Sequence, residues 1–315
     1  MRPFGGELEL ESLDEKIYFT DSGRSSIRLF LRSGENNKKH YLLPNFFCEV
    51  IEEIFIQENV KYTFYPINEH LEIDKEFISK QNYDVLYVIN YFGKYTNLDN
   101  LNLEDKNIIE DNVFFDDFSN RYNFKNWYAF NSFRKISSIA DGSLAKTNML
   151  IENELIQNIN TFSDMKYRAK DIKYNYLYNN EFSEKEYLEL FNQAENLLDY
   201  QKDICKISDK SIYVLANQKI DMKKRKERFD LLLKEFNEFS ILDNVDCYSF
   251  FPILIEKRDM VRTKLVEKNI FLPIHWPKST QDNFLYQNIL SIPLFENYDD
   301  KIFNKLIYAL KAILK

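Results

Sequence analysis

The chain has 315 residues, of which 44% are hydrophobic and 29% charged, a balance typical of globular rather than disordered proteins. A net charge of −8 gives no reason to expect a nucleic-acid or anionic-membrane partner. Because the sequence contains neither an apolar signal core nor an uncharged run long enough to span a bilayer, we expect a soluble protein.

The cysteines Cys48, Cys205 and Cys247 are odd in number and far apart in the sequence. This pattern predicts neither a disulfide framework nor a metal site, and it favours a reduced, cytoplasmic compartment. The basic run Lys223–Arg228 precedes apolar residues, so we interpret it as the solvated face of a helix.

The N-terminal part of the chain contains a strand, a glycine turn and a helix in succession. Before them, Gly5–Leu10 is expected to be an extended segment that could cross onto a partner or cap a site. Ile17–Ser26 then predicts a short strand and a polar turn, followed by an apolar helix. The free N–H groups at such a helix start favour a phosphate. The alternative is that Ser25 only caps the helix.

Apolar runs of strand length then alternate with charged segments of helix length, such as Asp74–Lys80. This alternation predicts a mostly parallel sheet covered on both faces, with ligands at the carboxyl ends of its strands. The predicted strands are Tyr41–Pro44, Val60–Tyr65, Val85–Asn90, Asn107–Asp111 and Trp127–Phe130.

The stretch Asn131–Gly142 follows the last of these strands. Two residues separate Ser132 from Lys135, so a hydroxyl and an ammonium can face the same way on one helical turn or tight loop. A lysine that binds pyridoxal phosphate needs this geometry, with the hydroxyl directed at the phosphate and the amine at the aldehyde. The alternative is that Arg134 and Lys135 form a solvated basic pair beside a turn.

The C-terminal half predicts long packing helices and then a small α+β lobe. We expect a large α/β domain over residues 1–205 and a small domain over residues 206–315. The predicted helices are Leu150–Phe162, Glu184–Leu198, Met222–Phe236, Asp259–Lys268 and Asp299–Lys315, and the predicted strands are Ile212–Ala216, Cys247–Ile255 and Ile270–His275.

In this order the motifs resemble the fold type I pyridoxal-phosphate aminotransferases, and among them the DegT/StrS group of sugar aminotransferases. The resemblance extends from Gly6 to Leu290–Leu294, which looks like a serine-leucine-proline strand of that group's small domain. Its strength lies in the collinear order of several degenerate motifs.

For the cofactor's phosphate and ring, the resemblance implies the following residues. Gly23, Arg24 and Ser25 look like the phosphate-binding turn, and Ser132 looks like the phosphate serine. Phe47, in a loop similar to the one that carries the stacking aromatic, would lie on the pyridine ring.

For the chemistry, Asp111 resembles the aspartate that pairs with the pyridinium nitrogen, and Lys135 resembles the Schiff-base lysine. Asp141-Gly142 resembles the turn after that lysine, and His275 lies where the family places substrate-facing residues. His275 is alternatively a packed residue beside tryptophan. Burial and the cation of Arg134 would keep the Lys135 amine neutral.

The resemblance implies a homodimeric aminotransferase that uses pyridoxal 5'-phosphate, a keto sugar and an amino-acid donor. The sequence departs from that pattern in the short Ser132–Lys135 spacing, in Asn112–Phe114 after the aspartate, and in Gly142-Ser143 after the lysine. Another reaction at the same cofactor and a non-catalytic binding or scaffold relative are therefore alternatives.

Overall fold

The computed structural model describes residues 15–152, 161–277 and 279–314. The segment Gly5–Leu10 lies outside these residues, as does most of the helix predicted over Leu150–Phe162. Residues 150–152 are not helical, and a helix is described from Thr161 onward. No helix in the described part of the chain has the length and apolarity that crossing a membrane requires.

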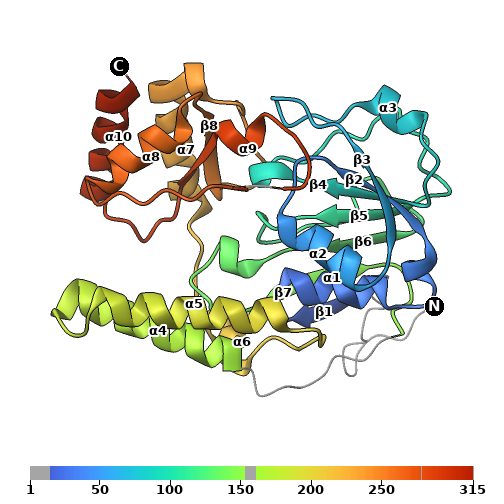
Figure 1. Cartoon of the computed structure of the whole chain (residues 1–315), viewed down its shortest axis with the longest axis horizontal. Helices are drawn as coiled ribbons and strands as arrows, with labels where there is room; N and C mark the ends of the chain where they lie inside the picture. The colour runs from blue at the N-terminus through green and yellow to red at the C-terminus, as the bar shows by residue number, and fades with distance from the viewer. Residues whose placement is uncertain (1–14, 153–160, 278, 315) are drawn as a thin grey trace, which may run out of the picture.

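A seven-stranded sheet forms the larger part of the molecule (Figure 1). Its strand order is β1-β7-β6-β5-β4-β2-β3, and within this sheet only β7 runs against its neighbours, which confirms the mostly parallel sheet. The strands are β1 Lys16–Thr20, β2 His40–Pro44, β3 Lys61–Tyr65, β4 Val85–Ile89, β5 Asn107–Asp111, β6 Trp127–Phe130 and β7 Ser143–Thr147.

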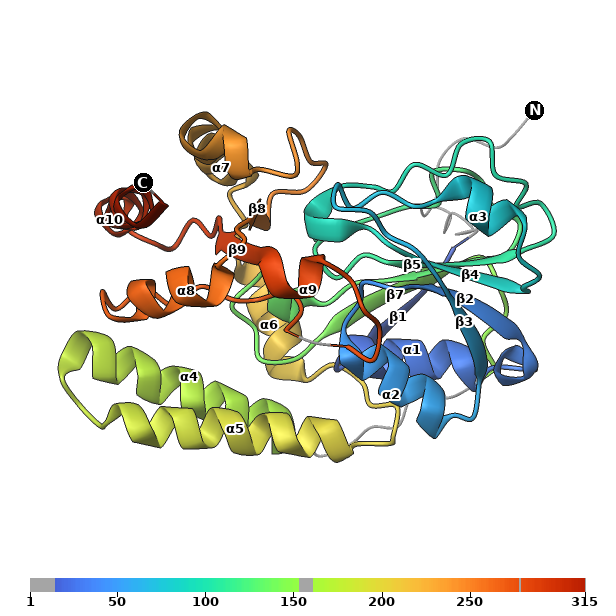
Figure 2. The same ribbon diagram turned by 45° about the horizontal axis from the view of Figure 1, so that its top comes forward.

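Strands β4 and β6 are continuous apolar runs, as expected of strands that are covered on both faces. Every residue of β4, β5 and β6 is buried. Helices α1 (Gly23–Leu31) and α2 (Glu49–Gln57) lie together on one face of the sheet (Figure 2). The short helix α3 (Lys75–Ser79) confirms the helix expected within Asp74–Lys80.

Two long helices follow the sheet and pair with each other. They are α4 (Thr161–Asn179) and α5 (Glu184–Tyr200), and we call them the hairpin. A capping box formed by Ser183 and Glu186 starts α5, which confirms the helix predicted there. In Figure 1 the hairpin extends away from the sheet along one side of the molecule.

The C-terminal elements form a smaller lobe around a two-stranded antiparallel sheet. Three predicted helices and the strand within Cys247–Ile255 are confirmed. We retain the domain boundary at residues 205 and 206 as a proposal. Its elements are α7 Met222–Phe236, β8 Phe250–Leu254, α8 Arg258–Val266, α9 Leu285–Asn288, β9 Ile289–Pro293 and α10 Asp300–Leu314. Helix α6 (Asp209–Asn217) lies beside the hairpin instead (Figure 1), where the hydroxyls of Tyr167 and Ser211 share a hydrogen bond of 2.8 Å.

Two strands predicted in the C-terminal part of the chain are wrong. The apolar run Ile212–Ala216 lies in α6, because Ser208 accepts the N–H of Ser211 as an N-cap and so starts a helix. The run Ile270–His275 is irregular, since Pro273 has no N–H to donate to a ladder. Its carbonyl accepts the N–H of Ser291 at 3.2 Å.

Candidate active site

A pocket of about 300 Å³ lies at the carboxyl ends of the parallel strands, between the start of α1 and the inner side of the hairpin. We call it the central pocket. Its size suits a small organic ligand. Five of the eight site residues predicted from the sequence line it, namely Gly23, Arg24, Asp111, Ser132 and Lys135.

The start of α1 is held against the segment that carries Ser132 and Lys135. The N–H of Gly142 donates to the carbonyl of Asp21 at 2.5 Å. The hydroxyls of Ser26 and Ser143 share a hydrogen bond of 2.8 Å. These bonds bring the first turn of α1 and Ser132 to one pocket, although the two segments are far apart in the sequence.

The helix cap of α1 is Ser22 and not Ser25. Ser22 accepts the N–H of Ser25 at 3.2 Å and itself lines the central pocket. Ser25 is fully buried, and its hydroxyl accepts from Gln201 at 3.4 Å. The structure therefore does not bring Ser25 to the pocket, whereas it does bring Gly23 and Arg24.

Asp111 ends β5 with its carboxyl group directed at the pocket. The Tyr87 hydroxyl donates to its Oδ2 at 2.9 Å, and the N–H of Val113 donates to its Oδ1 at 3.1 Å. Burial raises the pKa of Asp111 to about 7, against these two hydrogen bonds and the charge of Lys135. The preceding Glu110 instead accepts from Trp127 Nε1 at 2.6 Å, as strand alternation requires.

Lys135 closes a single 3-10 turn, η3 (Phe133–Lys135), directly after β6. Burial lowers the pKa of its amine, and the cations of Arg134 and Arg24 add to this shift, while Cys48 and Asp111 oppose it. The turn is held from the other side by the N–H of Phe133, which donates to Gly142 O at 3.1 Å.

Gly142 has φ +124°, and a Cβ there would come within 2.6 Å of Ile207 Cδ1. Both the backbone conformation and the available space therefore require glycine at this turn.

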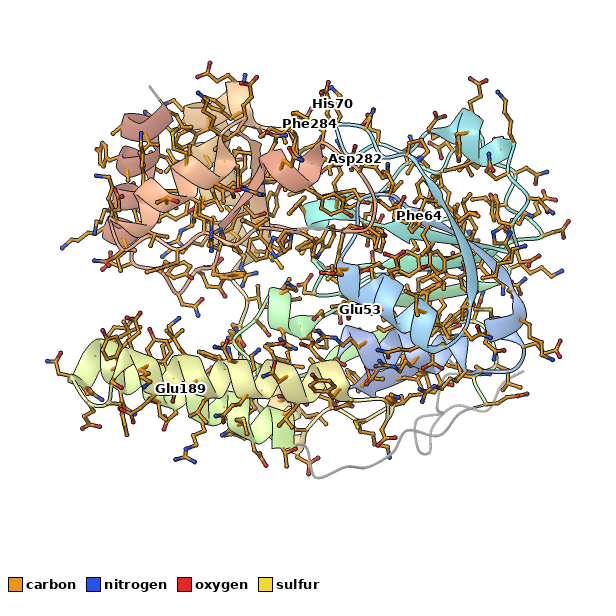
Figure 3. All side chains as sticks on the ribbon, in the orientation of Figure 1. Glu53, Phe64, His70, Glu189, Asp282 and Phe284 are labelled. Atoms are coloured by element: carbon orange, nitrogen blue, oxygen red, sulfur yellow. The ribbon has the colours of Figure 1, made fainter. Side chains whose placement is uncertain are left out.

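Phe47 does not reach the central pocket. Its side chain is fully buried and stacks on Phe64 of the edge strand β3, with ring centroids 5.5 Å apart. Figure 3 labels Phe64 on that strand. The next residue, Cys48, lines the pocket. The ring of Phe47, predicted to stack on the cofactor, is therefore directed into the core. The thiol of the neighbouring Cys48 faces the pocket instead.

His275 is also a core residue. Its ring packs among Phe92, Phe114 and Phe250, and its Nδ1 lies 3.1 Å from Ser291 Oγ. Burial lowers its pKa well below the ordinary value, so the ring stays neutral. The alternative of a packed histidine is the one that the structure supports, and the neighbouring Trp276 lines the pocket instead.

The hairpin supplies pocket residues that the sequence did not single out. Lys166 and Lys170 of α4 and Glu195 of α5 line the central pocket. Glu195 Oε1 accepts from Arg134 Nη2 at 2.6 Å and also pairs with Lys166. Arg24 pairs with Asp199 of α5. The spacing of the two lysines by four residues is ordinary in a lysine-rich chain, so it carried no signal.

Solved structures share this architecture. DesV from S. venezuelae, in complex with a ketimine intermediate, matches with a TM-score of 0.63 at 14% identity over 94% of this chain and 84% of that one. NtdA from Bacillus subtilis, with bound cofactor PMP, gives 0.62 at 14% identity over 94% and 73%. A DegT DnrJ EryC1 StrS aminotransferase from Brucella abortus gives 0.59 at 14% identity over 94% and 85%.

This chain has the fold of the fold type I aminotransferases. No protein-family model matches its sequence, and no curated protein does. The fold predicted from the motif order is therefore confirmed by structure at low sequence identity.

Within this aminotransferase fold the pocket residues fit pyridoxal phosphate. An amine with a lowered pKa, a buried carboxyl group and the first turn of a helix beside a serine are the groups that the aldehyde, the ring nitrogen and the phosphate would require. No group of three or more His, Cys, Asp or Glu side chains among the described residues is placed to hold a metal ion.

Proposed function

We propose that this chain is a pyridoxal-phosphate-dependent aminotransferase that acts on a keto sugar, nucleotide-linked, with an amino acid such as glutamate as the donor. The observation that carries the proposal is that Lys135 and Asp111, from different strand ends, face one pocket. The structural neighbours that are aminotransferases support the same reaction class.

The phosphate would be held by the first turn of α1 and by the hydroxyl of Ser132. A Cβ at Gly23 would meet Phe130 and Asn131 O at ordinary van der Waals distance, so space alone does not require glycine there. Arg24 adds a positive charge on the same side. A helix N-terminus and a cation together stabilise a dianion.

The cofactor, when bound, supplies an electron sink for the electrons of the breaking Cα–H bond. Asp111 would hold a proton on the ring nitrogen, and a cation there would favour the ionised form of a carboxyl group whose pKa burial raises. Lys135 would bind the aldehyde and, once released, carry the proton as base and acid. The lowered pKa of Lys135 favours the neutral amine.

We also propose a cytoplasmic homodimer, as the family resemblance implies. The alternatives of another reaction at the same cofactor and of a non-catalytic relative are outcomes of the following test.

The purified protein is saturated with pyridoxal phosphate, reduced with borohydride and digested for peptide mapping. We expect a yellow protein and a pyridoxyl group on Lys135, with no adduct in Lys135→Ala. Lys146→Ala is the control, since Lys146 pairs with Asp117 outside the pocket and its loss should leave the adduct intact.

Amino transfer from glutamate to keto-sugar nucleotides is then measured. If Lys135 carries the pyridoxyl group but no amino group is transferred, the result would favour another reaction at the same cofactor. If the protein takes up no cofactor, the result would contradict the proposal and favour a non-catalytic binding protein.

A further inference from the structure

The side of the central pocket formed by the hairpin carries its own positive charge. Lys166 and Lys170 lie one helical turn apart on α4 and both line the pocket. From these positions we infer that the hairpin forms a second anion-binding subsite, in which Lys166 and Lys170 receive a phosphate or carboxylate group of the substrate. The inference rests on the proposed function in one respect: it assigns the anion site formed by the start of α1 and Ser132 to the phosphate of the cofactor.

The two lysines differ in their partners. Lys166 shares the Glu195 carboxylate with Arg134, and its side chain is 12% exposed. Lys170 is half-buried and has no ion pair within the described ranges. The charges that act on Lys170 are those of Arg134 and Lys173, both of the same sign. A half-buried ammonium surrounded by cations is costly unless an anion joins it.

The charges around the pocket leave room for such an anion. Five basic side chains and only two acidic ones line it, and one of the acids is Asp111, whose pKa is raised. A cofactor phosphate would be met by Arg24 and the start of α1. Glu195 is the lining carboxylate that pairs with Lys166 and Arg134. Outside the lining, Asp21, Asp141 and Asp199 also act on Arg134, but none of them is among the charges that act on Lys170.

Anion binding at this subsite should be coupled to proton uptake. Burial lowers the pKa of Lys166 to about 6 and that of Lys170 to about 8, and neighbouring cations add to both shifts. An anion favours the charged amines, so it raises both pKa values when it binds. The charged groups that face the two amines are Arg24, Arg134, Lys135, Glu195 and Lys173.

Calorimetry with inorganic phosphate tests the subsite on the protein saturated with pyridoxal phosphate, in buffers of different ionisation enthalpy. At a working pH of about 7.5, we expect the wild-type protein to take up protons when it binds phosphate. Lys166→Gln/Lys170→Gln should weaken binding by about tenfold or more and abolish the uptake. The control Lys185→Gln/Lys223→Gln removes the same charge at exposed sites and should bind as wild type does.

Glutarate titrated in the same way identifies the source of the anion. Tighter binding of glutarate than of phosphate assigns the subsite to a carboxylate of the amino donor, and the reverse assigns it to a phosphate of the acceptor. Equal binding of both anions to the double variant and to wild type would overturn the inference. Loss of pyridoxal phosphate binding in the double variant would also overturn it, because the lysines would then belong to the cofactor's seat.

Failure of the proposed function gives a different pattern. If wild type takes up no cofactor, the cofactor-free protein should bind two phosphates. One should be lost in Arg24→Gln/Ser132→Ala and the other in Lys166→Gln/Lys170→Gln. A single phosphate, insensitive to the hairpin lysines, would reject the subsite while leaving the question of the cofactor to the borohydride test.

Discussion

The guanidinium of Arg225 donates to the main-chain carbonyl of Ile136 at 2.8 Å, one residue after Lys135. Its Nε also pairs with Glu296 at 2.5 Å. Arg225 lies on α7 and is 1% exposed, so this contact is a buried link between the small lobe and the turn that carries Lys135. The position of that turn depends on where α7 packs.

Arg225→Met should therefore destabilise the protein and loosen the turn. It leaves Glu296 and the Ile136 carbonyl without their partner, which we expect to cost about 3 kcal/mol in the free energy of unfolding. Chemical denaturation measures this loss, and hydrogen exchange of peptide 131–142 should speed up. Arg168→Met, at an exposed arginine of α4, is the control and should change stability by less than about 0.5 kcal/mol.

Asp111 should give the cofactor-free protein a pH dependence of stability. Its pKa in the folded protein is about 7 against an ordinary value of 3.8, so the folded protein binds the proton more tightly. This contribution is complete below about pH 4 and is lost as the pH rises to about 7, at most about 1.4 kcal/mol for each pH unit. Asp111→Asn should flatten that part of the curve, and an unchanged slope would contradict the burial argument.

The same variant tests the chemical role of Asp111. Asp111→Asn should still bind pyridoxal phosphate through the phosphate seat but lose transamination by orders of magnitude, since an amide cannot hold the ring proton. Single-turnover absorbance changes measure the loss. Full activity in Asp111→Asn would move the role to Asp116 or Asp117 or remove the need for a ring proton.

Lys166 should shift stability in the opposite direction. Its folded pKa of about 6 lies below the ordinary value of 10.5, so the unfolded chain binds more protons between those limits. Stability should rise with pH in that window, and Lys166→Gln should reduce the slope, leaving above about pH 8 the part that Lys170 contributes. Denaturation midpoints from pH 6 to about pH 9 measure the effect. Lys185→Gln, at an exposed lysine, should keep the wild-type slope.

Gly93 should not tolerate a side chain. It has φ +88°, and a Cβ there would lie 1.8 Å from the carbonyl oxygen of Cys247. The Gly93 carbonyl accepts the N–H groups of Asp246 and Cys247, so the two segments cannot separate easily. Gly93→Ala should cost about 3 kcal/mol or more.

Gly34→Ala is the matched control for Gly93→Ala. Gly34 also has a positive φ, of +56°, but a Cβ there meets nothing within 4 Å. It should lose only about 1 kcal/mol, from the backbone term alone. Similar melting temperatures for the two variants would mean that the contact with Cys247 relaxes.

The site residues that could be predicted from the sequence are those that lie at the ends of strands. Asp111 and Ser132 follow apolar runs of a parallel sheet, and the topology alone brings such ends to one edge. The ring of Phe47 is directed into the core because the chain bends after β2, and the next residue, Cys48, lines the pocket. Composition could not show that aromatic rings would enclose His275, nor that a helix would form at Ile212–Ala216.

Within the described part of the chain, the hairpin lines the pocket through residues near its base, namely Lys166, Lys170 and Glu195. Phe162, Ala194 and Leu198 pack there in a small apolar cluster separate from the main core. Glu189, labelled in Figure 3, marks the half of α5 nearer the free end.

Whole turns, about 5.4 Å each, could thus be added or removed at that end without moving Lys166 or Lys170. Homologues should accordingly vary in length around residues 179–183 and keep their length at the base. The length of the hairpin can therefore change in evolution while the pocket residues at its base stay in place.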